Sequence, residues 1–243
     1  MLWRPGAWQP IAQRAIDETD RIVTAAVVAV DADERPPDAR TWLLDPGVTS
    51  PRQASAIHGI STEHARGHGV AAAPAIEEIT SAVAEVLNSA TPLVVMNARY
   101  DLSLLERECR RHGIEPLVKR LRGETSPVID PLVLDKYVDR YRKGSRNLQA
   151  LCEYYGVPLN DAHNAVADAV AAARAARSMG IKHSVRGTLG PAELHDLQVR
   201  AAAEQAVSLQ KYLRRTSNAT AYVESAWPIV SFSREEIGPV TRG

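Results

Sequence analysis

The sequence predicts an α/β protein with a mixed β-sheet flanked by helices. Two strand-like runs come first, and short strands then alternate with helices along the chain, an order typical of layered α/β domains. Hydrophobic residues make up 45% and charged residues 24% of the chain, which is ordinary for a globular protein with a real core. A length of 243 residues favours one globular core with an additional element.

The first part of the chain contains two predicted strands and a helix. The apolar run 22–31 and the partly alternating run 40–47 are both typical of strands, and the second ends at a Pro-Gly pair. Residues 51–74 are rich in turn-forming residues, so we expect a loop there. Ile and Val residues then repeat at helical spacing from Pro74 to residue 87, which predicts a helix that begins at the proline.

Short strands and helices alternate in the middle of the chain. Residues 93–96 and 127–130 have the length and content of buried strands. The stretch 101–113 is a predicted helix that ends at a glycine, and 132–142 also has a helical pattern. A further helix is expected at 147–156, where leucine and tyrosine side chains point inward and another glycine follows.

Two helices and an irregular end complete the pattern. The run 161–177 consists mainly of alanine and valine, and 191–215 predicts one long helix with proline in its first turn. We expect the long helix to be an appended element with His195 at its surface. The predicted organisation is therefore a domain over 1–183, followed by a helical extension and tail over 184–243.

Bulk properties exclude several classes of protein. Lys plus Arg and Asp plus Glu both number 29, so the formal net charge is zero and any polyanion site must be local. Cys109 and Cys152 lie in helical apolar patterns and are expected to be reduced core residues. The first residues lack a signal-peptide pattern, and no apolar run reaches the length of a membrane span. We expect a cytoplasmic protein without a membrane partner.

A histidine and an aspartate stand in the alanine-rich run. Small side chains let a helix pack closely on a sheet, while His163 and Asp168 at its start have the chemistry of a general base and a metal ligand. The alternative is a solvated helix aspartate and a surface histidine, which these two residues alone do not exclude.

A second pair follows a predicted buried strand. Asn97 and Asp101 lie just past residues 93–96, at the opening of a helix, and strand ends in open α/β sheets are where ligands bind. Asp101 alone is also explained as a helix-start carboxylate that interacts favourably with the helix dipole. That explanation does not account for both pairs.

Together these motifs resemble the DnaQ-like 3′–5′ exonuclease family, in the branch that has acidic residues and a catalytic histidine (DEDDh). Asn97 and Asp101 in NARYD match its second motif, and His163 and Asp168 in HNAVAD match its third. HGIS, beginning at His58, matches a family segment that lies near the substrate nucleotide. PVID with Asp130 and RNLQALCEYYGV (146–157) also stand where the family has a strand and a helix. The resemblance covers roughly residues 20 to 178 and implies an RNase H-like fold.

The resemblance also implies a chemistry. Two Mg²⁺ or Mn²⁺ ions roughly 4 Å apart would bind the scissile phosphate, with Asp101 and Asp168 as ligands, since these cations prefer carboxylate oxygens. His163 would deprotonate the attacking water, and Asn97 and His58 would contact the substrate. The substrate would be a nucleic acid with a 3′ end, with single-stranded DNA favoured, and the product a nucleoside 5′-monophosphate. Association with a DNA polymerase is a further implication.

The sequence departs from the family pattern at its start. The family's first motif is Asp-x-Glu on the central strand, yet residues 1–16 contain no Asp and no Glu, so the first-strand region, 1–20, is atypical. Glu18 and Asp20 have the required i, i+2 spacing in reversed order, in an expected surface turn. They are the candidate replacement ligands. Without them the site would hold a single ion at most, because too few carboxylates remain.

Three functional hypotheses follow. The first is a metal-dependent 3′–5′ exonuclease, which we favour, with activity reduced by the loss of the first acidic motif. The second is a non-catalytic nucleic-acid-binding or polymerase-associated module with the same fold. The third is a protein-interaction domain that uses the helix at 191–215. The basic stretch 139–147 either follows a phosphate backbone or is a solvated loop.

Overall fold

The fold begins with a β-hairpin. The computed structural model describes residues 19–30, 38–51, 55, 59–159, 164–183 and 189–230. Strand β1 (Thr24–Ala29) pairs antiparallel with β2 (Asp38–Asp45), in a register that sets Thr24 opposite Leu43 and Ala29 opposite Asp38. Both expected strands are confirmed. Their buried residues face the core, where Leu44 is fully excluded from solvent.

The stretch expected to be a loop contains a short helix and a strand. Helix α2 (Thr62–His68) begins at Ser61, whose hydroxyl accepts a hydrogen bond from the His64 backbone N–H. Strand β3 (Val70–Ala71) then pairs parallel with β2. The expectation was wrong because α2 buries little apolar surface and so lacks a helical pattern of apolar residues. Its N-cap serine was the available signal.

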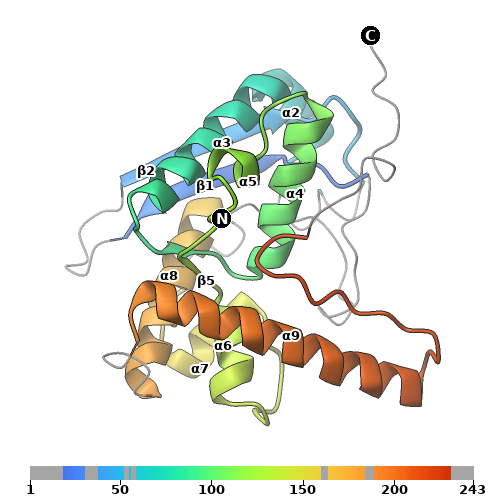
Figure 1. Ribbon diagram of the computed structural model, residues 1–243. Coiled ribbons are helices and arrows are strands. Elements are labelled where there is room, and N and C mark those ends of the chain that lie inside the picture. The colour runs from blue at the N-terminus through green and yellow to red at the C-terminus, as the bar shows by residue number, and fades with distance from the viewer. Residues whose placement is uncertain are drawn as a thin grey trace.

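Helices α3 (Ala72–Asn88) and α4 (Ala98–Arg111) pack on each other beside the hairpin, as Figure 1 shows. Ile76 and Ile79 of α3 and Leu105 of α4 are fully buried in the same core cluster as β1 and β2. A four-residue helix, α5 (Leu117–Arg120), follows α4 and is too short to be predicted from periodicity. The predicted helices over 74–87 and 101–113 are therefore confirmed, with each beginning two or three residues earlier.

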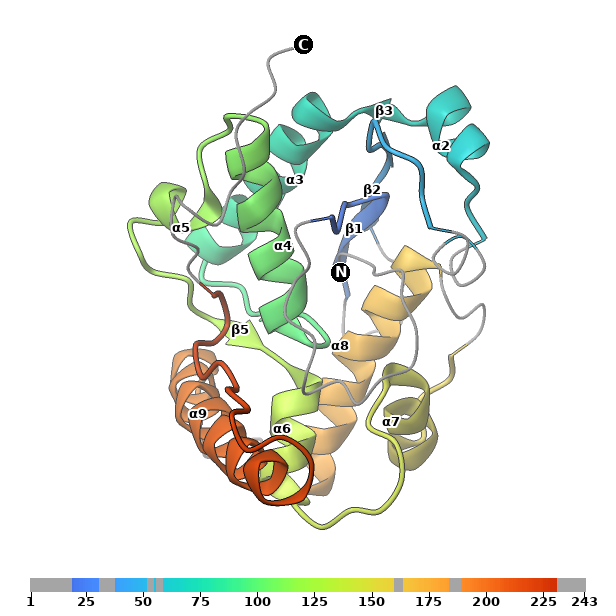
Figure 2. The same ribbon diagram turned by 90° about the vertical axis from the view of Figure 1, so that its right-hand side faces the viewer.

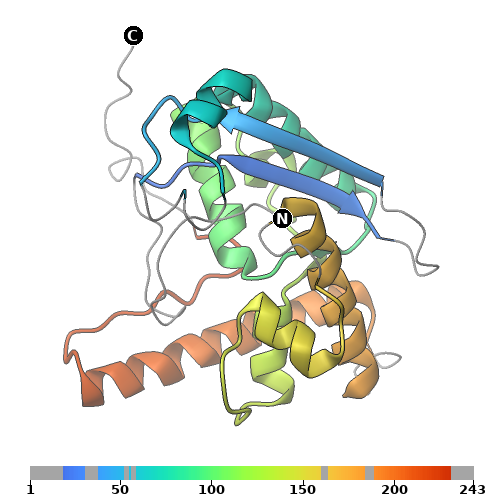
Figure 3. The same cartoon turned by 180° about the vertical axis from the view of Figure 1, so that it is seen from behind.

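The strands form two small sheets. Strands β4 (Leu93–Val94) and β5 (Val128–Ile129) pair in parallel, and in the described part of the chain they are separate from the three-stranded sheet of order β1-β2-β3. The expected mixed sheet is thus smaller and divided. Helix α8 (Ala165–Lys182) contacts both β1 and β4, so one helix connects the two sheets; Figure 3 shows it below the hairpin.

The remaining helices form the second half of the molecule. They are α6 (Pro131–Val138), α7 (Leu148–Tyr155), α8 (Ala165–Lys182) and α9 (Pro191–Thr216). Figure 2 shows them around β5, on the side away from α2 and α3. None of the helices in the described ranges has the length and apolar content that crossing a bilayer requires.

Helix α9 covers the edge of β5 and is not a free appendage. Gln198 accepts a hydrogen bond from the Asp130 backbone N–H at 2.7 Å and donates one to the Val128 carbonyl at 3.1 Å. His195 Nδ1 accepts from the Val128 N–H at 3.1 Å. These two side chains satisfy backbone groups that a neighbouring strand would otherwise bind. The expectation of a surface position for His195 was therefore wrong: the side chain is buried because it binds β5.

The chain after α9 returns to the core. Residues 221–230 have no regular secondary structure, but Trp227 is buried and lies 5.1 Å from His195 between ring centroids. The Val230 N–H donates to the Ser103 hydroxyl of α4 at 2.8 Å. The end of the described chain thus packs against α4.

Candidate active site

The start of α4 holds the predicted pair Asn97 and Asp101. Val95 and Met96 are buried after β4, and Asn97 then adopts a left-handed conformation (φ 63°, ψ 48°). Left-handed backbone is uncommon for residues other than glycine and recurs at functional sites. The Asn97 side chain makes no capping bond to α4. Asp101 lies in the first turn of α4 with only 4% of its surface exposed, so it is not a solvated helix-start carboxylate.

Asp130 fixes this turn. Its Oδ1 accepts hydrogen bonds from the backbone N–H groups of Asn97 and Leu132, both at 2.9 Å. Its Oδ2 accepts from the Ala98 N–H at 3.0 Å and the Trp227 indole at 3.4 Å. One carboxylate therefore caps α6 and also binds two N–H groups at the start of α4. Through them it sets the position of Asp101.

The Asp130 carboxyl is an unusual group because it is fully buried. Burial raises the pKa of Asp130, while the N–H donors around it, with Asn97 and Leu132 foremost, act in the opposite direction. Burial lowers the pKa of nearby Lys136, and the Asp130 charge opposes that change. Arg99 donates to the Glu224 backbone carbonyl at 2.8 Å. The start of α4 is thus surrounded by charged groups at low solvent exposure.

Asp168 lies in the first turn of α8. Asn164 caps this helix, its side chain accepting from the N–H groups of Val166 and Ala167. Asp168 is 5% exposed, so the interpretation of a solvated helix residue is wrong. The pKa of Cys152 in α7 is raised to about 11, first by burial of the thiol and next by the charge of Asp168. Asp168 therefore lies close to α7. A buried thiol with that pKa stays protonated, as expected for a core cysteine.

The small side chains of α8 explain this burial. Ala169, Ala171, Ala172 and Ala175 are all buried, and their size lets the helix approach β1 and α7 closely. A large residue at these positions would move the helix, and Asp168 with it, away from the sheet. The alanine-rich composition thus places a carboxylate inside the fold.

The other predicted site residues have mixed outcomes. His163, His58 and Glu18 lie outside the described residues. Asp20 is half-buried, not at the surface, because it accepts a hydrogen bond from the Tyr100 hydroxyl at 3.0 Å. Tyr100 belongs to α4 and directly precedes Asp101, so this hydrogen bond brings Asp20 to the start of α4.

The described carboxylates do not by themselves form a complete metal centre. Within the described ranges, no three His, Cys, Asp or Glu side chains gather closely enough to hold an ion. Asp101 and Asp168 fit the donor type of a hard cation, and each also takes part in other interactions within the protein. Further ligands would have to come from water, from substrate phosphate or from residues outside the described ranges.

Sequence reasoning missed the residues that support the site. Asp130 was noted only as part of a strand motif, although an aspartate followed by proline is a signal for a helix N-cap. His195, Gln198 and Trp227 gave no signal, because each contacts β5 or Asp130 across a separation of more than 60 residues.

Asp101 and Asp168 are each buried in the first turn of a helix, in α4 and α8, within an α/β fold. The exonuclease family model of the RNase T type matches residues 10–176, more than half of the chain. The protein belongs to this exonuclease family.

A solved structure supports the same fold. The chain is similar to Exonuclease I of E. coli, whose crystal structure contains a dA16 oligonucleotide, with a TM-score of 0.58 and 19% sequence identity. The match covers 79% of this chain and 42% of Exonuclease I, so the chain spans less than half the length of that protein. At this identity the similarity shows the fold alone. No curated protein matches the sequence significantly.

Proposed function

We propose that the protein is a metal-dependent 3′–5′ exonuclease that releases nucleoside 5′-monophosphates from nucleic-acid 3′ ends. The observation that carries this proposal is the burial of Asp101 and Asp168 in the first turns of α4 and α8, in a chain of the exonuclease family. Burying an ionised carboxylate costs free energy unless partners compensate it. Both aspartates have partners within the protein, and a divalent cation would add to that compensation; metal-dependent phosphodiester hydrolysis uses such an ion.

Each residue has a proposed role. Asp101 and Asp168 would hold Mg²⁺ or Mn²⁺, and the ion, when bound, would withdraw charge from the scissile phosphate. His163 would accept the proton of the attacking water; its ordinary pKa, about 6.5, suits this role at neutral pH. Asn97, in its left-handed conformation, and His58 would contact the terminal nucleotide.

A cleavage assay tests the proposal. A DNA oligonucleotide labelled at its 5′ end, incubated with the protein and Mn²⁺, should shorten stepwise and release 5′-monophosphates. Asp101→Asn, Asp168→Asn and His163→Ala should each reduce the rate at least 100-fold, because each removes a group that contacts the ion or the water. An Asp196→Asn variant, changed at an exposed position of α9, is the matched control. Activity unaffected by Asp168→Asn would refute the assignment.

The second candidate is a nucleic-acid-binding module that does not hydrolyse its ligand. It is favoured by one observation, the absence of Asp and Glu from residues 1–16, where the family has its first two carboxylates. If the protein is an exonuclease, Glu18 and Asp20 are the candidate replacement ligands, and the Glu18→Gln/Asp20→Asn variant should lose cleavage. Under the second candidate, cleavage would be absent throughout and oligonucleotide binding would not change in His163→Ala.

The substrate class is proposed as single-stranded DNA. The Exonuclease I structure contains a DNA oligonucleotide, and transfer of that preference to this chain is part of the proposal. Parallel assays with DNA and RNA of one sequence would establish it. Association with a DNA polymerase is a further prediction that a pull-down with purified polymerase subunits would test.

A further inference from the structure

A basic and aromatic surface lies at the end of the molecule away from the start of α8. It consists of Arg140, Tyr141 and Lys143 from the loop between α6 and α7, together with Tyr154 of α7 and Lys182 of α8; we call it the 140–143 surface. This loop is the basic stretch that sequence analysis left undecided between a phosphate contact and a solvated loop.

The loop has a fixed shape because two of its arginines point inward. Arg142 binds both oxygens of buried Asp135, with contacts of 3.0 to 3.2 Å, and Arg146 pairs with the same carboxylate. Arg146 also donates to the backbone carbonyls of Asp139 and Arg140. Both guanidinium groups are thus held inward by Asp135 and by backbone carbonyls, so the proposed phosphate contacts come from other side chains of the loop.

Helices α7 and α8 continue the surface. Tyr154 donates to the Asp139 carboxylate at 3.1 Å, and Lys182 Nζ lies 3.7 Å from the centre of the Tyr154 ring. Tyr155 donates to Asp135 at 2.8 Å, and its hydroxyl lies 3.3 Å from His183 Nε2. The loop, α7 and the end of α8 are thus joined by side-chain contacts.

The outward side chains of the loop have few partners. Tyr141 is 86% exposed, and its one ring contact among the described residues is the Arg140 guanidinium, 5.9 Å from the ring centre. Among the described residues, the side chains of Arg140 and Lys143 form no ion pair and no hydrogen bond. An exposed tyrosine beside unpaired cations matches the stacking platforms of proteins that bind single strands.

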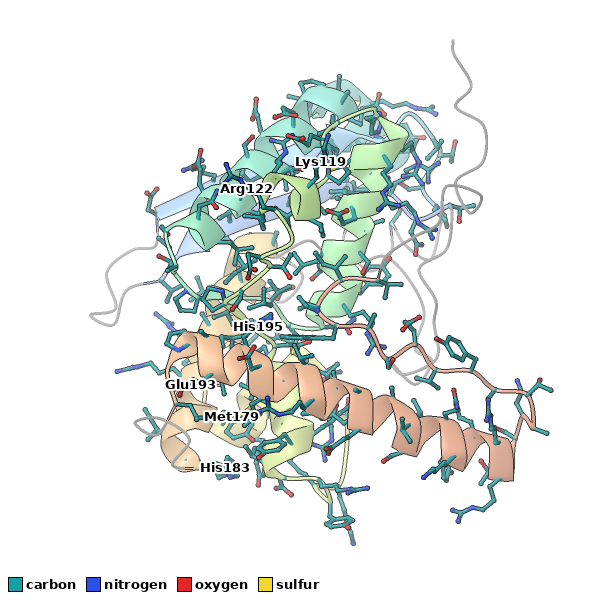
Figure 4. All side chains as sticks on the ribbon, viewed as in Figure 1. Lys119, Arg122, Met179, His183, Glu193 and His195 are labelled. Carbon is teal, nitrogen blue, oxygen red and sulfur yellow. The ribbon has the colours of Figure 1, made fainter. Side chains whose placement is uncertain are left out.

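The surface has a defined position relative to the candidate active site. Asp168 lies in the first turn of α8 and Lys182 at its end, so the rise of the helix separates them by about 21 Å. Figure 4 shows His183, at this end of α8, at the lower edge of the molecule beyond Met179. A strand with its 3′ end at Asp168 would need several nucleotides to reach Lys182.

We propose that the 140–143 surface binds single-stranded nucleic acid several nucleotides upstream of the 3′ end. Arg140, Lys143 and Lys182 would contact phosphates, and a base would stack on Tyr141. The inference rests on the proposed function for the position of the 3′ end. The family of the chain favours this ligand. Because the net charge of the chain is zero, attraction of a polyanion has to come from a local basic surface such as this one.

Oligonucleotide binding in EDTA tests this inference independently of cleavage. The full-length protein and an Arg140→Ala/Lys143→Ala variant would be titrated with a fluorescent single strand of about 16 nucleotides, the upper range of such sites, at several salt concentrations. Loss of two phosphate contacts should reduce the slope of log K against log salt by about 1.4. Tyr141→Ala should weaken binding about 5- to 100-fold without changing that slope.

The matched control removes two exposed cations, Lys119 of α5 and Arg122 just after it, on the other half of the molecule (Figure 4). Lys119→Ala/Arg122→Gly keeps the charge change equal, and glycine suits the φ of 52° at position 122. This variant should bind as the unmodified protein does. A dinucleotide, too short to reach the surface, should bind all variants equally.

The outcomes separate the two proposals. If cleavage is never observed but binding shows the expected changes, the surface is supported and the exonuclease proposal fails. If the Arg140→Ala/Lys143→Ala variant folds, as its thermal midpoint would show, and binds the long strand with an unchanged slope, the inference is overturned. Competition by poly-glutamate as strong as that by the oligonucleotide would also overturn it, because it would indicate an acidic protein partner.

Discussion

Replacing Asp130 with asparagine should destabilise the protein by about 2–4 kcal/mol. The two carboxylate oxygens accept four N–H groups, three of them from the backbone at 2.9 to 3.0 Å. Asparagine keeps a single acceptor oxygen, so its NH₂ group must face two of those donors. A buried donor without an acceptor costs about 1–3 kcal/mol, and the lower part of that range applies to the 3.4 Å indole contact.

Urea denaturation measures this change. The Asp130→Asn variant should unfold at a lower urea concentration with an unchanged m value, since the surface exposed on unfolding stays the same. Asp196→Asn at an exposed position of α9 is the control and should lie within about 0.5 kcal/mol of the unmodified protein. If both variants have the same free energy of unfolding, Asp130 does not hold the start of α4, and our account of how Asp101 is positioned fails.

Two other predictions concern stability. A Cβ atom at Gly69 would lie 2.4 Å from the Ala65 carbonyl oxygen, so Gly69→Ala should force the backbone apart at a cost of about 1–3 kcal/mol and lower the thermal midpoint. Gly67→Ala is the control, because a Cβ atom there has open space, and it should raise the midpoint slightly. Equal midpoints for the two variants would contradict the steric argument. Burial lowers the pKa of His195 below its ordinary value, so its contribution to stability is present above about pH 6.5 and is lost as pH falls toward the lower folded pKa. His195→Gln, which keeps an acceptor for the Val128 N–H, should show a smaller loss of stability between pH 7 and pH 5 in the same denaturation assay, and an identical pH profile would exclude His195 as the cause.

The local elements of this fold could be predicted because their signals lie within a few residues. Periodic apolar residues identified α3 and α4, and the glycine at 156 correctly marked the end of α7, where it adopts a left-handed conformation (φ 66°). Helix α2 was missed because few of its residues are buried. The division of the strands into two sheets was also missed, since strand pairing depends on segments far apart in sequence.

The part of the candidate site that could be predicted also has its signal within a few residues. The Asn97 and Asp101 pair follows a short apolar run that is visible in the sequence, so the position at a strand end and helix start could be inferred. That Asp168 is buried depends on how closely α8 packs, which composition suggests but does not determine. The N-cap role of Asp130 had a local signal in the proline that follows it, but its hold on the start of α4 and its contact with Trp227 join positions 32 to 97 residues apart and could not be inferred.

The contact of α9 with β5 affects how the protein can be shortened. The family match ends at residue 176, which invites an expression boundary soon after α8. A fragment ending there would leave the backbone groups of Val128 and Asp130 without the Gln198 side chain and would remove the indole from the Asp130 carboxylate. Such a fragment would expose a strand edge capable of pairing with other copies, so we expect it to aggregate while the full-length chain stays dispersed at the same concentration.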